Sequence, residues 1–393
     1  MAPILNTLER MGEALQGCLQ RLVAVEWEDL PPPARQRAVQ VLADDLVAAL
    51  SALDEPQVRL ARERQLALAT GTGQASVLVA GLPRLDLLQA ATLNGLAMGW
   101  NELDEGYRKA VCHGGLYVLP ALLASAELRG SSMREVLRAL VLGYETVARV
   151  AEAWRPPALA IHPHALLAPV GAAAGLAFVN RLSAQDTLAA VAGAATMGMV
   201  GPFNHALKGV LARNLWAAQG AAAGLNAVEW AQCGIGGNAT SVHHALGTVL
   251  GFQADPSSLE LSGRGAWAIE SGYQKVNACC QYAHSTIEAV EQLLARHPAL
   301  KGGEPVAAIE VEVHPLGYGL ADQHPATTLG AKFSVPHAVA ATVVHGHGGV
   351  DAFDARSLQD PRIARLREQT RLLPFADVRP WPHDRPARVT LIL

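Results

Sequence analysis

An acidic stretch that ends in a histidine offers the clearest chemistry in this sequence. It runs from Asn101 to His113, and its first half holds Glu102, Asp104 and Glu105. A carboxylate that faces an imidazole is suited to acid–base catalysis, because one group accepts a proton while the other donates one. The alternative is a solvated acidic turn with an incidental His113, and the spacing alone favours that alternative.

A second histidine segment, Ile161-His162-Pro163-His164, follows a helix end that two prolines break. Pro163 restricts His162 to an extended backbone conformation, so its imidazole can project rigidly. A capping or packing role for His162 is the alternative. Two histidines at this spacing could also chelate a metal, but the sequence indicates no third ligand, so we expect no metal site.

Basic residues occur in two further segments. In the first, Lys208 and Arg213 lie beside an expected helix start and suit an anionic substrate group, unless they belong to an ordinary exposed turn. In the second, Lys275 and Cys280 lie where two expected domains meet, which is a common position for a ligand site. Cys280 alone is more often a small core residue.

The composition disfavours several classes of protein. The 31 basic and 35 acidic residues give a formal net charge of −4 without a basic block, which disfavours nucleic acid as a partner. No apolar run reaches the roughly 20 residues that span a bilayer, and the N-terminus lacks a signal sequence. The five cysteines form no CxxC pair, and no dinucleotide-binding fingerprint or P-loop occurs. We therefore expect a cytoplasmic enzyme without metal or nucleotide cofactor.

Helical patterns extend over about two thirds of the chain, and these helices must position the candidate residues. Ser132 and Glu135 form a capping box before an apolar helical face, and Ser183 opens a second helix in the same way. A third helix, expected over 214–227, is so rich in Ala and Gly that it must pack tightly. These patterns indicate a large all-helical domain.

The pattern changes beyond a Gly/Ser-rich stretch at 262–275, which has the composition of a domain linker. Ser285 and Glu288 are expected to open a helix, and another helix is expected over 335–345. In this part of the chain the helices are separated by segments in which apolar residues recur with a different period.

Two segments near the C-terminus have strand periodicity. Apolar residues alternate with glutamates over 309–313, as in a half-buried strand, and 387–393 is a closing strand. The sequence therefore predicts a mainly α fold, with an all-helical domain over 1–265 and a smaller α/β domain over 266–393.

Taken together, these segments resemble the MmgE/PrpD family, which includes 2-methylcitrate dehydratase, cis-aconitate decarboxylase and iminodisuccinate epimerase. The resemblance runs through nearly the whole chain. It implies an all-helical large domain, a smaller α/β lid, a homodimer and no required cofactor. The matching segments are Leu93-Asn-Gly, the acidic loop with His113-Gly-Gly, Val118-Leu-Pro-Ala-Leu-Leu-Ala, Gly143-Tyr-Glu, Ile161-His-Pro, Arg213-Asn-Leu-Trp, the stretch Lys275 to His284 and Ala331-Lys-Phe-Ser-Val-Pro.

The resemblance also implies site residues. Carried over residue by residue, they are Glu102 or Asp104, His113, His162, Arg213 and Cys280. Lys275 is a weaker second candidate for a substrate-binding cation.

The sequence departs from the family pattern at several of these positions. The acidic loop of the family reads LDFDDTH, whereas Glu102 replaces the first Asp here and Gly106 replaces the Thr. Gly114 stands where proline is usual, Arg213 stands where a decarboxylase has Lys, and Cys280 occupies a position that can hold His. These changes argue against a cis-aconitate decarboxylase and leave dehydratase and epimerase activities open.

The first interpretation is a hydro-lyase that acts on a small hydroxy di- or tricarboxylate resembling 2-methylcitrate. Either His113 or His162 would remove the proton next to a carboxylate, and the other would protonate the departing hydroxyl. Glu102 or Asp104 would orient and polarise the imidazole.

Nearby cations must stabilise the carbanion, and Arg213 is the first candidate for that role, before Lys275. An epimerase or racemase would share the first step and return the proton to the opposite face. A non-catalytic carboxylate-binding protein is the alternative from another class.

The C-terminal end differs from the family as well. Family members are expected to continue past the strand at Val389 with a segment that returns toward the large domain, whereas this sequence ends at Leu393. We therefore expect the return segment to be missing, which leaves the anchoring of the lid open.

Overall fold

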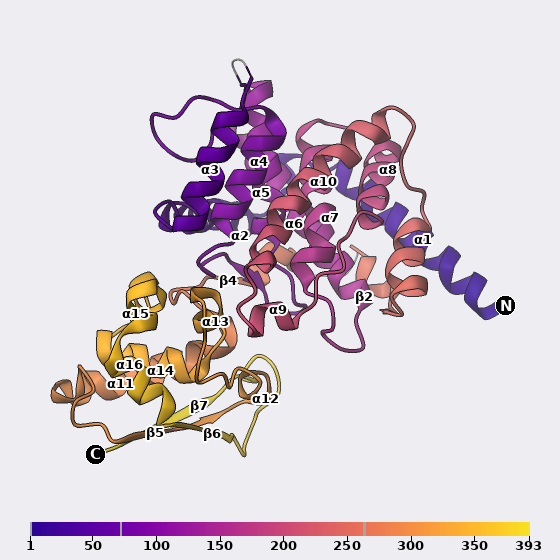
Figure 1. Ribbon diagram of the computed structural model, residues 1–393. Helices are drawn as coiled ribbons and strands as arrows, with labels where there is room; N and C mark the ends of the chain where they lie inside the picture. The colour runs from indigo at the N-terminus through magenta and orange to yellow at the C-terminus, as the bar shows by residue number, and fades with distance from the viewer. Residues whose placement is uncertain (1, 71–72, 262–264) are drawn as a thin grey trace. The chain divides into compact units, whose positions relative to one another are not determined.

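The computed structural model describes residues 2–70, 73–261 and 265–393, which fold into two compact units (Figure 1). Unit 1 comprises Met1–Trp100, Asp104–Pro202 and Asn214–Gln274, and unit 2 comprises Asn101–Leu103, Phe203–Arg213 and Lys275–Leu393. The acidic stretch found in the sequence is therefore divided between them: Glu102 belongs to unit 2 and Asp104 to unit 1.

Unit 1 is built almost entirely of helices. Its principal helices are α1 (Ala2–Val23), α2 (Pro32–Ser51), α3 (Pro56–Leu68), α4 (Leu87–Met98), α5 (Gly114–Arg129), α6 (Met133–Ala153), α7 (Pro163–Val179), α8 (Ala184–Ala195) and α10 (Leu215–Gln232). Two short antiparallel strand pairs accompany them, β1 (Gly106–Tyr107) with β4 (Gly272–Tyr273) and β2 (Trp154–Arg155) with β3 (Gln253–Ala254). The large all-helical part that the sequence predicts is confirmed.

Helix α7 lies at the centre of unit 1, and every one of its residues is buried. It packs against α5, α6, α8 and α10, which surround it in Figure 1. Small residues permit this close packing: a Cβ added to Gly220 of α10 would come within 2.3 Å of Ala168, and one added to Gly224 within 2.4 Å of Ala172. The tight packing expected from the Ala/Gly-rich sequence of α10 is thus confirmed.

The helix starts that the sequence predicts in unit 1 are also present. Ser132 caps α6, with a reciprocal hydrogen bond from its own N–H to Glu135, and Ser183 accepts the Asp186 N–H at the start of α8. Both helices begin where a side chain replaces the missing intrahelical partner of the first N–H groups.

The expected linker at 262–275 is wrong for most of its length. Residues 262–264 lie outside the described residues, but Trp267 to Tyr273 belong to unit 1, where Ala268 and Ile269 are buried. The carboxylate of Glu145 on α6 accepts the Ala268 N–H at 2.6 Å, so this Gly-containing segment is packed and hydrogen-bonded. Its composition resembled a linker, but Ile269 supplies apolar area that buries against the core.

Unit 2 is a smaller α/β structure around a three-stranded sheet. Strand β5 (Ala308–Val313) is central, with β6 (Thr370–Pro374) parallel on one side and β7 (Ala387–Ile392) antiparallel on the other. The helices of this unit are α9 (Asn204–Leu207), α11 (His284–Arg296), α12 (Pro315–Tyr318), α13 (Thr328–Lys332), α14 (Val335–His345), α15 (Ala355–Gln359) and α16 (Pro361–Glu368).

Both strands and both helices predicted for this unit are confirmed. Ile309, Val311 and Val313 of β5 are fully buried while the residues between them are partly exposed, and α14 spans 335–345 as expected. The second helix, α11, begins at His284, one residue before the expected start, but the cap expected from Ser285 is wrong, because α11 has no side-chain cap. The chain enters it directly from a 3-10 turn at Gln281–Ala283, so its first turn continues an existing one.

None of the helices in the described parts of the chain combines the length and the apolar character that crossing a membrane requires.

Candidate active site

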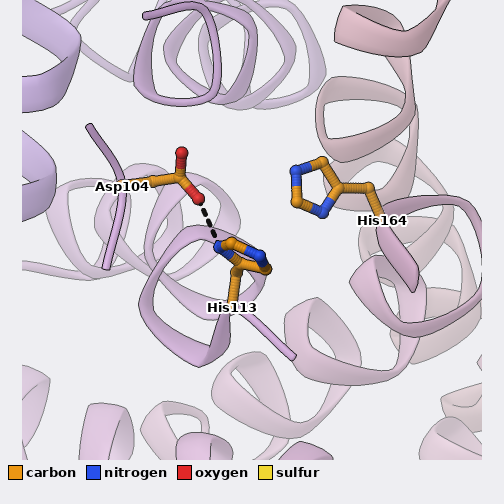
Figure 2. Close-up of side chains that lie close together, drawn as sticks. All are labelled: Asp104, His113 and His164. Carbon is orange, nitrogen blue, oxygen red and sulfur yellow. Dashed lines mark ion pairs between the residues drawn. The ribbon is translucent and has the colours of Figure 1, made fainter. Parts of the chain in front are cut away.

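Unit 1 holds a buried carboxylate–imidazole pair. Asp104 Oδ2 lies 2.6 Å from His113 Nδ1, and the Asp104 side chain is fully buried while His113 is 12% exposed (Figure 2). Glu105, the next residue, is fully buried as well. The alternative of a solvated acidic turn is therefore wrong, because the acids face protein groups rather than water.

The contacts of His113 determine which of its nitrogens carries the proton. Its Nδ1 lies 2.6 Å from Asp104 Oδ2 and 2.8 Å from the backbone oxygen of Glu105. A peptide carbonyl can only accept a hydrogen bond, so Nδ1 must be the donor. The neutral ring consequently has its lone pair on Nε2, which makes Nε2 the basic atom of His113.

His164, near the start of α7, lies next to His113. The ring centroids are 4.8 Å apart in an edge-to-face arrangement, as Figure 2 shows. The hydroxyl of Tyr117 on α5 lies 2.8 Å from His164 Nδ1 and is buried with it. The candidate site of unit 1 thus combines one carboxylate, two imidazoles and a phenol.

His162 occupies the N-cap of α7 in the extended conformation that Pro163 favours. Its Nδ1 accepts the backbone N–H of His164 at 3.2 Å, and its ring packs between His164 and Trp216, at centroid distances of 4.5 and 5.3 Å. Because Nδ1 is an acceptor, the neutral ring carries its proton on Nε2. His162 therefore caps the helix, as one interpretation expected, and still presents an N–H donor.

Asp104, His113 and His164 could in principle hold a metal, since one ligand atom from each lies within 4.8 Å of the others. Two ligands of one tetrahedral metal, each about 2.1 Å from it, lie roughly 3.4 Å apart. Asp104 Oδ2 and His113 Nδ1 are closer, at 2.6 Å, and hydrogen-bond directly. The observed geometry is that of an acid–base pair, and these two atoms would have to separate to share an ion.

Unit 2 holds a second buried polar cluster, which gathers around Asn101 and Glu102. Glu102 lies 2.5 Å from Arg213 and 3.5 Å from Lys275, and Lys332 donates to the side chain of Asn101 at 2.9 Å. All five side chains are buried. The cluster thus brings three cations together, Arg213, Lys275 and Lys332, and cations of this kind suit an anionic ligand.

Glu102 has a strained backbone, with φ at +55°. Non-glycine residues rarely adopt this left-handed conformation, which costs of order 1 kcal/mol or more. The two ion pairs of its carboxylate hold it there.

Cys280 belongs to the same unit and is partly buried. Its backbone N–H donates to the carbonyl of Lys332 at 2.9 Å. Burial raises the pKa of the Cys280 thiol to about 11, so the thiol is protonated at neutral pH. This side chain is suited to packing or weak hydrogen bonding rather than to nucleophilic attack.

The structure brings some of the expected site residues together and separates others. Asp104 meets His113, as one of the two expected pairings required, whereas Glu102 meets Arg213 and Lys275 instead of an imidazole. Lys208, the other basic residue noted near Arg213, is exposed.

Sequence reasoning missed His164, Tyr117, Asn101 and Lys332. His164 was visible in the His-Pro-His segment, and Lys332 in Ala331-Lys-Phe-Ser. The available signal was a charged or polar residue inside an apolar stretch, which must find a partner if it is buried.

Comparison with known proteins agrees with this architecture. Residues 20–256 match the family model described as the MmgE/PrpD N-terminal domain, and residues 278–392 match the MmgE/PrpD C-terminal domain. A relative, the cis-aconitate decarboxylase-like protein oryM of Aspergillus oryzae (strain ATCC 42149 / RIB 40), is 27% identical over 372 residues, which cover 87% of this chain and 76% of that protein. With matched models that extend over most of both units, the chain belongs to the MmgE/PrpD family.

Proposed function

We propose that the protein is a cofactor-free lyase that dehydrates a small hydroxy di- or tricarboxylate, in the manner of 2-methylcitrate dehydratase, by removing a proton next to a carboxylate. The observation that carries the proposal is the Asp104–His113 pair, whose geometry leaves His113 Nε2 as a base. Family membership supports an enzyme with a small carboxylate substrate.

The proposed reaction starts at His113. Its Nε2 takes the proton from the carbon next to a substrate carboxylate, and Asp104 stabilises the imidazolium that forms. The carbon–oxygen bond to the hydroxyl then breaks, and the departing hydroxide takes a proton from His162 Nε2 to leave as water. The products are an unsaturated acid and water, and solvent exchange returns both rings to their starting state.

The cationic cluster of unit 2 supports a carboxylate as the ligand of that unit. Arg213 can bind a carboxylate through two parallel N–H groups, and Lys275 and Lys332 add positive charge. Such cations also lower the energy of negative charge that develops next to a carboxylate. We assign substrate binding to Arg213 and Lys275, with Lys332 as an addition, and a packing contact to Cys280.

An NMR assay in D2O tests the proposal. The protein is incubated with a panel of hydroxy di- and tricarboxylates, with a His113→Gln variant as the matched control. Alkene signals that depend on His113 support a dehydratase. Deuterium incorporation without elimination would indicate an epimerase, and loss of carbon dioxide would indicate a decarboxylase. Binding without turnover would indicate a carboxylate-binding protein.

We also propose that the protein is a homodimer built on unit 1. Trp230 in the last turn of α10 and Ile235 just after it are 51% and 65% exposed, and they line a hollow together with Met197 and Ala227. Large apolar side chains grouped in this way are typical of a surface that another protein covers. Light scattering that gives a mass near 41.3 kDa at micromolar concentration would contradict the dimer.

A further inference from the structure

Two buried acids behind His113 have no part in the reaction proposed above. Glu105 follows Asp104 in the chain, and Asp45 lies on α2; both are fully buried. Charged groups rarely occur at such positions without partners, because desolvation disfavours the ionised form.

Glu105 connects three parts of unit 1 with the imidazole. Its carboxyl oxygens accept the Gly115 N–H of α5 at 2.6 Å and the Tyr144 hydroxyl of α6 at 2.8 Å. Its backbone oxygen accepts the His113 Nδ1 proton at 2.8 Å. The same residue therefore bonds through its side chain to α5 and α6 and through its backbone to the ring of His113.

Asp45 packs at the same turn of α5. A Cβ added to Gly115 would come within 2.0 Å of Asp45 Oδ2 and 2.7 Å of Val41, so only glycine allows α2 and α5 to approach this closely. Gly114 likewise lies against the ring of Tyr144, with 2.5 Å to an added Cβ. The two glycines after His113 thus make room for the acids and the phenol behind it.

Burial sets the protonation of the two acids. It raises the pKa of Glu105 to about 8, against the hydrogen bonds from Gly115 and Tyr144, and the Asp104 and Asp44 carboxylates add to the increase. Burial likewise raises the pKa of Asp45 well above its usual range, and the carboxylates of Glu105 and Asp104 add to it. At neutral pH Glu105 therefore retains its proton, and burial favours the protonated form of Asp45 in the same way.

We propose that Asp45 and Glu105 form a carboxyl pair that positions His113, by holding in place the carbonyl that accepts its Nδ1 proton. This inference rests on the proposed function, since positioning matters to catalysis when His113 is the base. Ionisation of Glu105 above about pH 8 places a negative charge near the ring. The other titratable groups that face Glu105 are Asp44 and Asp45 from α2, Asp104, Cys112 and His113 from the loop, and Tyr144 from α6.

Nitrogen-15 NMR of the histidine side chains tests the proposal without any substrate. We expect the His113 signals, assigned by their loss in His113→Gln, to change with a midpoint near pH 8 in the wild-type protein. Glu105→Gln keeps the shape of the side chain and should abolish that change. Glu145→Gln is the matched control, because Glu145 is equally buried but bonds to Arg149 and the Ala268 N–H instead, and it should retain the change.

Two results would overturn the inference: a wild-type His113 signal without a transition near pH 8, or a transition that persists in Glu105→Gln. If Glu105→Gln does not fold, Asp44→Asn replaces it, and the midpoint should then fall because the Asp44 carboxylate contributes to the raised pKa of Glu105; an unchanged midpoint would mean that Glu105 does not cause the transition and counts against the inference. A transition that depends on Glu105 in a protein that turns over no carboxylate would uphold the pair and reject the proposed function. Turnover of a carboxylate without such a transition would reject the pair and uphold the proposed function.

Discussion

Two acids of one short stretch, Asp104 in unit 1 and Glu102 in unit 2, face opposite kinds of partner. Asp104 meets the imidazole of His113 at 2.6 Å, whereas Glu102 meets the guanidinium of Arg213 at 2.5 Å. An imidazole gains and loses a proton near neutral pH, but a guanidinium stays charged. The first pair can therefore transfer protons, and the second can supply only a constant charge. Acids separated by one residue in the chain thus differ in the chemistry that they can support, because their partners differ.

The largest effect should come from removing the imidazole of the unit 1 pair. His113→Gln deletes the base, and we expect turnover of a dehydrated hydroxy acid to fall by about 10⁴-fold, the upper end for one proton-transfer group. Steady-state kinetics with the substrate identified by NMR would measure it. Lys208→Ala is the control, because Lys208 is exposed and should leave the rate unchanged. A similar loss in both variants would contradict the assignment.

The next effect separates the two histidines of the His-Pro-His segment. His162→Ala removes the proposed proton donor, and we expect a loss of about 10²-fold or more in kcat. Removal of its capping bond should also lower stability, by about 1 kcal/mol. Rate and melting temperature should be measured on the same preparation, with His164→Ala beside it.

A different pattern would reassign the proton donor. His164 lies closer to His113 and contacts Tyr117, so a normal rate in His162→Ala together with a large loss in His164→Ala would transfer the role to His164. An early-melting His162→Ala variant with normal turnover would make His162 a capping residue alone.

The Glu102–Arg213 ion pair of unit 2 should contribute mainly to the free energy of unfolding. Glu102→Gln leaves Arg213 and Lys275 buried without their carboxylate, and breaking a buried ion pair in this way costs about 3–5 kcal/mol. Glu312→Gln is the matched control, since the Glu312–Arg388 pair of the same unit is largely exposed and should contribute less than about 1 kcal/mol. Urea unfolding followed by circular dichroism measures both. Equal losses would mean that burial does not distinguish the two pairs.

Removal of metal ions should have no effect on turnover. Because Asp104 and His113 hydrogen-bond to each other directly, we expect catalysis without a metal ion. Dialysis against EDTA should leave turnover intact. Loss of activity that one divalent cation restores would turn the same residues, with His164, into a metal site.

Much of the fold could be predicted from local patterns. The capping box at Ser132 and Glu135, the alternation over 309–313 and the Ala/Gly-rich face of α10 each encode an element through interactions within a few residues. The linker at 262–275 failed because composition does not report whether Ile269 finds a core to pack against. The cap expected from Ser285 is absent because the preceding 3-10 turn leads directly into α11.

The sequence by itself determined which residue types could do acid–base chemistry, and in which segments they lie. It also determined the family, through short motifs in a specific order. Only the tertiary structure decided that Asp104 rather than Glu102 meets His113. It also decided that Asp45 on a distant helix packs against Gly115, whose N–H bonds to Glu105. Pairings of this kind depend on how remote elements pack. Burial makes the stability of each charged group depend on its partner, because a charged group removed from water is stable only when its neighbours replace the lost solvation.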